Sequence, residues 1–379
     1  MDSNTVEQRT QQSLPDLKIS DFDYHLPNEL IAQTPIEPRD SSRLLVVKRQ
    51  DETLAHQHFR DIEEYLQPGD LLIANQSRVI PARLLGKRAE SGGAVEVLLL
   101  AERSDLGQDT WEALVRPGRR LREGARIFFG AETEEQARLI GEILERTEAG
   151  GRVVRFHVPG RSQERQNDPY ALLDVRQVID EIGKMPLPPY IHETLDDPER
   201  YQTVYARIRG SAAAPTAGLH FTPQLLERLR ARGVRTGFVT LHVGLDTFRP
   251  VESEDVREHK MHSEEIELDE TTAALINETR ARGGRVVAVG TTSVRVLESV
   301  ASLHEGRIVP YKGHTRLFIT PGYRYQAVDA LITNFHLPRS TLLLLVSAFM
   351  TKPLMERAYQ EAITERYRFF SFGDAMLIL

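Results

Sequence analysis

The sequence predicts an α/β protein, in which a main α/β domain, a partial barrel or a layered sheet with helices, is interrupted by an inserted small β-barrel domain. Over most of the chain, segments with helical periodicity alternate with short apolar strands. Between residues 71 and 158 the pattern changes to short β-type runs separated by turn residues. The 379 residues are enough for two domains. We therefore assign residues 1–17 to a disordered tail, 18–70 and 159–379 to the α/β domain, and 71–158 to the insertion.

Composition excludes several kinds of chemistry. The chain has no cysteine, so it has no thiolate nucleophile, disulfide, zinc finger or cysteine-ligated iron–sulfur cluster. The first 17 residues are polar, and the longest apolar run, Leu342–Met350, is too short to span a bilayer, so we expect a cytoplasmic protein. The net charge of −7 weakly opposes general nucleic-acid coating. However, residues 71–130 carry ten Lys/Arg and seven Asp/Glu, a local charge of +3.

The elements of the first half can be assigned in order. We predict a short helix at Leu26–Ala32 and a strand at Leu44–Val47. The β module is expected to contain the strands Leu71–Ala74, Val95–Leu100, Trp111–Val115, Ile127–Phe129 and Val153–Val158, with hairpin turns at Gly92-Gly93, Pro117-Gly118 and Gly150-Gly151. Residues 134–149 fit neither a helix nor a strand clearly.

Helices and strands alternate after the module. The expected helices are Ala171–Ile182, one beginning at Pro223, Asp269–Arg282, Val294–Leu303, an apolar helix ending at Phe349, and Leu354–Tyr367. The expected strands are Val234–Val243, Arg285–Val289 and Ala330–Asn334. The prolines of Met185–Ile191 exclude a helix in that segment.

The stretch Ser211–Thr222 is the first candidate for a binding site. It is small and polar, and Thr222 can cap the helix that Pro223 begins. The unpaired N–H groups of a helix end can bind a carboxylate or phosphate, and small residues before it let a ligand approach the backbone. The alternative, which this stretch alone favours, is a tight surface turn before an ordinary capped helix.

Polar residues also follow three of the expected strands. These are His242 with Gly244 and Thr247; Gly290 with Thr291, Thr292 and Ser293; and Asn334 with His336, Arg339, Ser340 and Thr341. Ligands of open α/β sheets bind outside the carboxyl ends of strands, so these residues and Thr216, Gly218 and His220 predict one pocket. A single histidine is more often structural than catalytic. Because these three occupy equivalent positions after strands, we regard a catalytic and a structural role as equally supported.

Two groups of basic residues fall in the β module. One comprises Arg116, Arg119, Arg120, Arg122 and Arg126, and the other comprises Arg78, Arg83, Lys87 and Arg88. Runs of charge are usually solvated faces. Because these residues are concentrated in one module of an acidic protein, contact with nucleic-acid phosphates is as well supported as a solvated surface.

Metal and nucleotide motifs are weak. His259 and His262 lie beside Glu264 and Glu265, but the spacing is loose and a third convincing ligand is lacking, so we expect no metal. The glycine-rich signatures of the usual dinucleotide and nucleoside triphosphate folds are also missing from the sequence.

Ten motifs run in order from about Asp21 to Leu379. They are Leu30–Gln33, Ser42–Leu45, Asn75–Ala82, Met185–Ile191, Tyr201–Ala206, Ala213–Thr222, His242–Phe248, Gly290–Glu298, Asn334–Thr341 and Tyr367–Leu379. Together they resemble one family, the S-adenosylmethionine:tRNA ribosyltransferase-isomerases of queuosine biosynthesis. The sequence departs from the family pattern at Asp246, where glycine is usual, and at Met350–Lys352, which replaces a small-residue turn.

The resemblance implies a reaction. Members of the family transfer the ribosyl part of S-adenosylmethionine to 7-aminomethyl-7-deazaguanine at the wobble position of tRNA, giving epoxyqueuosine, adenine and methionine. S-adenosylmethionine is then a co-substrate, and no prosthetic group is expected. Its sulfonium acidifies the adjacent carbon, so a neutral histidine can act as base. The implied roles are proton removal by His220 or His242 and assistance to adenine loss by His336.

The resemblance also implies contacts to both substrates. Substrate binding is expected at Thr216, Ala217, Gly218, Leu219, Thr222, Gly244, Thr247, Thr291, Thr292, Ser293, Arg295, Asn334, Arg339, Ser340 and Thr341. Binding of tRNA phosphates is expected at Arg43, Arg78, Arg116, Arg119 and Arg120, and the protein is expected to be a monomer. Two alternatives remain, another S-adenosylmethionine-dependent tRNA-modifying enzyme such as a methyltransferase, and a non-catalytic RNA-binding relative. The missing glycine-rich loop opposes the first, and the intact pocket motifs oppose the second.

Overall fold

The computed structural model describes residues 17–131, 133–147, 150–159, 174–244, 251, 253–259, 261 and 263–379. The chain divides into two units. The main unit comprises Met1–Ser77, Pro188–Ile208 and Ala214–Leu379, and the barrel unit comprises Arg78–Leu187 and Arg209–Ala213. The expected tail, apart from Leu17, and the start of the helix expected at Ala171–Ile182 lie outside the described residues.

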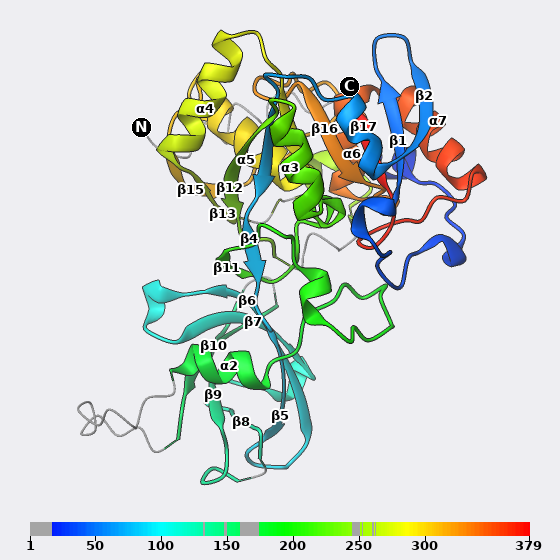
Figure 1. Ribbon diagram of the computed structural model, residues 1–379. Coiled ribbons are helices and arrows are strands. Elements are labelled where there is room, and N and C mark those ends of the chain that lie inside the picture. The colour runs from blue at the N-terminus through cyan, green and yellow to red at the C-terminus, as the bar shows by residue number, and fades with distance from the viewer. Residues whose placement is uncertain are drawn as a thin grey trace. The chain divides into compact units, whose positions relative to one another are not determined.

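A nine-stranded mixed sheet forms the centre of the main unit, in the order β15-β13-β12-β3-β14-β16-β17-β1-β2 (Figure 1). Its strands are β1 (Arg43–Lys48), β2 (Thr53–His58), β3 (Leu71–Asn75), β12 (Arg235–Leu241), β13 (Glu264–Leu268), β14 (Val286–Val289), β15 (Tyr311–Thr315), β16 (Ala330–Asn334) and β17 (Ala375–Ile378). Strands β12, β3, β14 and β16 are parallel, whereas β17 is antiparallel to β16 and pairs Ala375 with Asn334. The carboxyl ends of four strands and the amino end of β17 therefore share one edge of the sheet.

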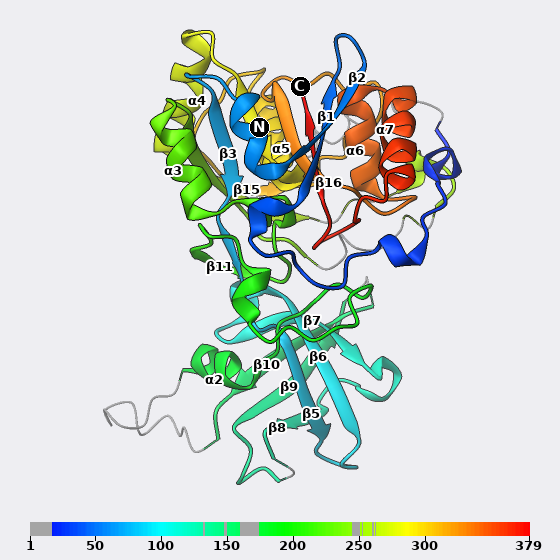
Figure 2. The same ribbon diagram turned by 45° about the vertical axis from the view of Figure 1, so that its right-hand side comes forward.

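Helices flank this sheet (Figures 1 and 2). The α-helices of the main unit are α3 (Pro223–Ala231), α4 (Glu270–Ala281), α5 (Gly290–Leu303), α6 (Thr341–Met350) and α7 (Lys352–Thr364). Its 3₁₀ helices are η1 (Ile19–Phe22), η2 (Asn28–Leu30), η3 (Arg39–Ser41), η4 (Phe59–Glu64), η8 (Pro198–Tyr201), η9 (Thr216–His220) and η11 (Val256–Glu258). Every residue of β14 and β16 is buried, as expected for apolar strands that are covered on both faces.

Side chains determine where three of these helices begin. Thr222 Oγ1 accepts a hydrogen bond from Leu225 N at 3.1 Å and caps α3, with Pro223 in the first turn. Asp269 caps α4, and Ser340 caps α6. Helix α5 differs, because the residue before it is Val289, which supplies no side-chain cap.

The barrel unit is a closed antiparallel barrel in the order β10-β7-β6-β5-β8-β9. Its elements are β5 (Arg83–Arg88), β6 (Ala94–Glu102), β7 (Thr110–Arg116), β8 (Arg126–Phe129), β9 (Leu139–Arg146), β10 (Arg152–His157), α2 (Val175–Ile182), η5 (Ser104–Leu106) and η6 (Gly118–Arg120). Alternate residues of β6, namely Val95, Val97 and Leu99, point into the core, to which α2 adds Val178 and Ile179. Two short strands, β4 (Ser77–Val79) and β11 (Ile208–Ser211), form a separate two-stranded sheet.

The predicted fold class, a mixed α/β domain with an inserted β-barrel, is confirmed. Three local predictions are wrong. Leu71–Ala74 was grouped with the β module, but β3 lies between β12 and β14 in the main sheet, because an apolar run of this length carries no information about its partners. Pro117-Gly118 does not close a hairpin, since β7 pairs with β6 and β10 rather than with β8. Helix α5 begins at Gly290 instead of Val294.

None of the helices in the described part of the chain has the length and apolar character needed to cross a membrane.

Candidate functional site

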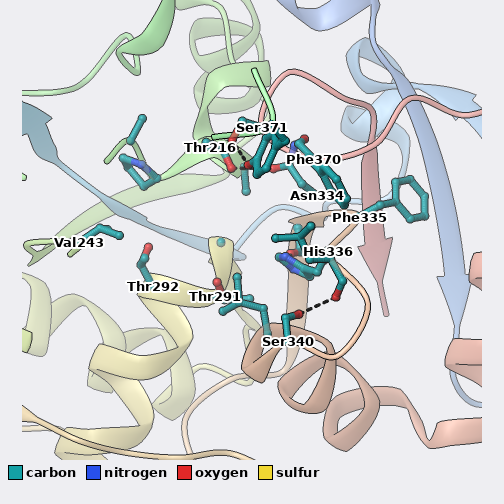
Figure 3. A pocket seen from close by; sticks show the side chains of 18 residues that line it. Thr216, Val243, Thr291, Thr292, Asn334, Phe335, His336, Ser340, Phe370 and Ser371 are labelled. Atoms are coloured by element: carbon teal, nitrogen blue, oxygen red, sulfur yellow. Dashed lines mark hydrogen bonds between the residues drawn. The ribbon is translucent and has the colours of Figure 1, made fainter. Parts of the chain in front are cut away.

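A pocket lies at the sheet edge where β14 and β16 end and β17 begins (Figure 3). Its lining comes from segments far apart in the sequence: Tyr190, Ala214–Ala217, Val243, Gly290–Thr292, Thr333–Leu337, Ser340, Leu342, Phe370 and Ser371. Adjacent strands whose connections leave in opposite directions open a crevice at this position in α/β sheets. The topology therefore explains why these segments meet.

The lining is uncharged. It is rich in hydroxyl groups, and among the described residues no Asp, Glu, Lys or Arg belongs to it. His336 and Tyr190 are the lining residues whose side chains ionise, and burial raises the pKa of Tyr190 far above its usual value. A proton exchanged directly between this lining and a ligand at neutral pH must therefore involve His336 or a hydroxyl group.

Asn334 lies at the centre of the polar network in this pocket. Its Nδ2 donates to Phe370 O at 3.0 Å, and because a carbonyl oxygen only accepts hydrogen bonds, this contact fixes the orientation of the amide. The same Nδ2 lies 3.3 Å from His220 Nε2, and Thr216 Oγ1 donates to Asn334 Oδ1 at 3.4 Å. Asn334 thus connects β16, η9 and the segment before β17.

His220 lies behind Asn334 and does not line the pocket. Since Asn334 Nδ2 donates to Nε2, the proton of the neutral ring is on Nδ1, which lies 2.8 Å from Ser42 Oγ. The ring stacks on Phe59, with centroids 4.9 Å apart. Burial, helped by the charges of Arg368 and Arg39, lowers the pKa of His220 to about 3. A neutral imidazole with both nitrogens engaged orients Asn334 rather than exchanging protons with a ligand.

His336 lines the pocket directly, and Figure 3 shows it projecting into the same space as Thr216 and Asn334. Its Nε2 lies 2.7 Å from Thr333 Oγ1, and its backbone N–H donates to the hydroxyl of Tyr359. Nδ1 has no hydrogen-bond partner among the described residues. Burial lowers the pKa of His336 to about 3, so the ring is neutral at physiological pH.

His242 follows β12 but is not part of the lining, whereas its neighbour Val243 is. Consecutive side chains of an extended chain point to opposite sides, so His242 points away from the pocket. Its Nδ1 is buried without a hydrogen-bond partner in the described part of the protein, and burial lowers its pKa. The geometry therefore gives neither His220 nor His242 direct access to a ligand.

The first turn of α5 faces the pocket without a capping side chain. Gly290, Thr291 and Thr292 line it, so the N–H groups that an α-helix leaves unpaired at its start point toward a ligand. The Oγ1 atom of Thr292 is buried and has no hydrogen-bond partner among the described residues. This helix end can receive a carboxylate. The end of α3 was the first candidate for such a site, although the Ser211–Thr222 stretch alone favoured an ordinary capped helix. It is closed, because Thr222 caps it and donates to Asp40 Oδ2 at 3.2 Å.

Gly290 is needed at this helix start. Its φ of +85° lies in the region that side chains disfavour, while a Cβ there would make only ordinary contacts, the nearest with Ala217 at 3.5 Å. Replacing Gly290 by Ala is expected to lower the free energy of unfolding by about 1–2 kcal/mol through backbone strain. Urea-induced unfolding measures the change. Gly244→Ala is the matched control, since no atom of the described residues lies within 4 Å of its Cβ position and its φ is outside the left-handed region; equal losses in both variants would contradict the account.

Several predicted site residues have structural roles outside the lining. A Cβ on Gly218 would come within 2.1 Å of the Tyr205 hydroxyl, and Leu219 is buried. Ser293 Oγ donates to Val289 O, and Arg295 forms a buried ion pair with Glu264. Burial lowers the pKa of Arg295 to about 10.

Of the remaining predicted residues, some lie outside the lining, some lie outside the described residues, and the others line the pocket. Arg339 pairs with Glu254 at 3.4 Å, and Gly244 and Thr341 are not part of the lining. Thr247, Asp246 and His262 lie outside the described residues. From the predicted set, the lining contains Thr216, Ala217, Gly290, Thr291, Thr292, Asn334, His336 and Ser340. Across the residues that the structure describes, no cluster of three or more His, Asp or Glu side chains could hold a metal ion.

The basic residues expected to contact phosphate are of two kinds. Arg43 is engaged within the main unit, where its guanidinium lies 3.7 Å from the Tyr367 ring centroid and donates to Glu365 O. Arg116, Arg119 and Arg120 are exposed and form no ion pair with any carboxylate of the described chain. Arg78 is half-buried at the start of the barrel unit.

Comparison with known proteins identifies the family. The family model described as "Queuosine biosynthesis protein" matches residues 19–378. The chain belongs to this queuosine biosynthesis family. A relative from Symbiobacterium thermophilum is 57% identical over 363 residues, covering 96% of this chain and 100% of the relative, and one from Heliobacterium modesticaldum is 53% identical over 365 residues, with the same coverage. Both are named S-adenosylmethionine:tRNA ribosyltransferase-isomerase.

A solved structure of the queuosine biosynthesis family gives the same result. The S-adenosylmethionine tRNA ribosyltransferase from Thermotoga maritima is 41% identical, and the match covers 95% of this chain and 100% of that one with a TM-score of 0.53.

The lining residues that were not predicted individually include Tyr190, Val243, Thr333, Phe370 and Ser371. Four of them lie in the motifs that carry the resemblance to the queuosine biosynthesis family. Tyr190 belongs to Met185–Ile191, Val243 follows His242, and Phe370 and Ser371 belong to Tyr367–Leu379. These motifs therefore contained the signal, although their residue types carry no obvious chemistry.

Proposed function

We propose that this protein is an S-adenosylmethionine:tRNA ribosyltransferase-isomerase. It transfers the ribosyl moiety of S-adenosylmethionine to 7-aminomethyl-7-deazaguanine at the tRNA wobble position and releases adenine and methionine. The observation that carries the proposal is the similarity to relatives of that name over their whole length. The uncharged pocket supports it, because no cationic side chain of the described lining would repel a sulfonium.

Within this proposal the small substrate binds in the pocket. The start of α5 and Thr292 hold the methionine carboxylate, the lining hydroxyl groups bind the ribose, and the rings of Tyr190 and Phe370, whose centroids are 4.8 Å apart, offer aromatic surface to the adenine. His336 assists the departure of adenine as a neutral hydrogen-bond donor through Nδ1, with Thr333 donating to Nε2. His220 positions Asn334.

Replacing Thr292 by Val tests the carboxylate site. Valine keeps the shape but removes the buried hydroxyl that lacks a partner. We expect the KM for S-adenosylmethionine to rise about tenfold, as for loss of a hydrogen bond to a charged group. The affinity for tRNA should stay constant. Ser293→Ala is the control, because Ser293 Oγ donates to Val289 O instead of lining the pocket. An unchanged KM in Thr292→Val would remove Thr292 from the site.

The tRNA is proposed to contact the barrel unit through Arg116, Arg119 and Arg120, which are exposed and lack carboxylate partners among the described residues. Arg43 and Arg78 were expected to share this role, and the engagement of Arg43 by Tyr367 and Glu365 makes it the weaker candidate. We propose that the protein acts as a monomer and that it works in the cytoplasm, where tRNA is found.

The decisive experiment incubates the purified protein with S-adenosylmethionine and tRNA carrying 7-aminomethyl-7-deazaguanine. Free adenine together with a mass gain on the tRNA is the expected result. Formation of S-adenosylhomocysteine would instead indicate methyl transfer, and neither product with bound tRNA would indicate a non-catalytic RNA-binding protein. The same reaction with tRNA that contains guanine at the wobble position is the control.

A further inference from the structure

The outer face of the barrel unit carries a groove of its own. It is lined by Leu85, Gly86, Lys87, Ala94–Glu96, Arg116, Pro117, Phe128, Gly130 and Ala131. These residues belong to four neighbouring strands, β8, β5, β6 and β7, and to the turns beside them. The groove therefore runs across a continuous antiparallel surface.

The strand register places apolar and basic side chains side by side in this groove. Lys87 pairs with Phe128, Leu85 pairs with Glu96, and Glu96 pairs with Arg116. The β5 neighbour of Leu85, Leu84, is fully buried, so Leu85 points outward. Leu85 is 48% exposed in the centre of β5 and lines the groove, so its side chain is available to a partner.

The charge at one end of the groove favours an anionic partner. Arg116 is exposed, and it is followed by Arg119, Arg120 and Arg122, which are exposed as well and form no ion pair with a described carboxylate. Glu96 is the single acidic residue among the described lining residues, and it pairs with Arg83 at 2.8 Å. A polyanion therefore meets unpaired positive charge next to apolar surface.

A buried arginine holds this basic turn in place. Arg152 is 7% exposed, and its guanidinium donates to four carbonyl groups, those of Gly118, Leu121, Gly150 and Gly151, at 2.6–3.2 Å. It thus ties the turn that carries Arg119 and Arg120 to the β9–β10 hairpin. A fixed turn loses little conformational entropy when it binds a phosphate.

We propose that this groove binds one unpaired nucleotide of the tRNA, with the base on Leu85 and Pro117 and the adjoining phosphate on Arg116. The inference rests on the proposed function and deepens it. Leu85 and Arg116 are two strands apart, about 10 Å, which matches the reach of one nucleotide between base and phosphate. Apolar surface beside cations is how proteins hold unpaired bases, whereas paired RNA hides its base faces.

The test measures binding of an unmodified tRNA transcript to the full-length protein by fluorescence anisotropy over a range of salt concentrations. Leu85→Ala is expected to weaken binding about fivefold, at the lower end of the contribution of a stacked base, with an unchanged salt slope. Arg116→Ala is expected to reduce the slope of log affinity against log salt by about 0.7, because one phosphate contact with an unpaired strand is lost.

Two controls match these variants. Leu106 is 43% exposed in the barrel unit outside the groove, and Arg230 is an exposed arginine of α3. Leu106→Ala and Arg230→Ala should bind as wild type does. Wild-type affinity and slope in both groove variants would overturn the proposal and leave the groove to a protein partner. Crosslinking of 4-thiouridine-substituted tRNA gives a second readout, and no crosslink to the groove strands would also overturn it.

The outcome separates this inference from the function itself. If wild-type protein releases adenine but Leu85→Ala keeps its tRNA affinity and its KM for tRNA, the groove inference fails and the function stands. If wild-type protein releases no adenine but Leu85→Ala binds tRNA more weakly, the groove inference stands and the function fails.

Discussion

Replacing His336 by glutamine is expected to lower the kcat of adenine release by about 10²–10⁴-fold, the usual contribution of a positioned acid–base group. His336 is the lining imidazole, its Nε2 is held by Thr333, and its Nδ1 has no partner among the described residues. Glutamine can keep the hydrogen bond to Thr333 Oγ1 but cannot present a ring nitrogen to the adenine. Single-turnover measurement of adenine release on saturating tRNA isolates this step.

The matched control is His192→Gln, because His192 is exposed in the main unit and does not line the pocket. It should react at the wild-type rate. The pKa of His336 near 3 adds a second criterion, since the ring is neutral throughout pH 5–8 and its ionisation should leave no limb in the pH–rate profile over that range. A wild-type limb near pH 6.5 that disappears in His336→Gln would contradict the neutral-donor role.

The sequence predicted most of the segments that form the pocket, but it did not predict the contacts between their side chains. Strands that end in polar residues were recognisable, and so was the small stretch that supplies Thr216 and Ala217. The expectation that strand ends meet followed from the topology of parallel sheets. The amino end of β17 could not be found in this way, because β17 is antiparallel to β16. In addition, Phe370, in the segment before β17, has a φ of +70°, a conformation rare for an aromatic residue.

The sequence also could not separate the three histidines. A shift of one residue along a strand or turn moves a side chain to the opposite side of the chain. Val243 and His242 are consecutive residues, yet only Val243 lines the pocket. His220 resembled a catalytic residue because it follows the small stretch, yet its Nε2 accepts from Asn334 and its Nδ1 faces Ser42. The partners that decide its role come from segments more than 100 residues away. Only the folded chain brings them together.

The free energy of unfolding is expected to decrease in acid, because His220 is buried as a neutral ring. The pKa of His220 is about 3 in the folded protein, mainly because burial disfavours the charged ring, and about 6.5 in the unfolded chain. Between these values the unfolded chain binds a proton that the folded chain does not, so stability falls as the pH falls. The stabilising contribution is complete above about pH 6.5, and about 2 kcal/mol of it is lost between pH 7 and pH 5.

His220→Gln should remove this dependence while retaining an acceptor for Asn334. The free energy of unfolding of the main unit is measured with urea at pH 7 and at pH 5. The decrease from pH 7 to pH 5 is expected to be about 2 kcal/mol smaller in His220→Gln than in wild type, whatever the variant's stability at pH 7. His192→Gln should keep the wild-type dependence, since its ring is exposed. Equal pH dependence in wild type and His220→Gln would mean that His220 is already protonated in the folded chain. Such a ring could not accept from Asn334, and the orientation of the amide at the centre of the pocket would have to be reversed.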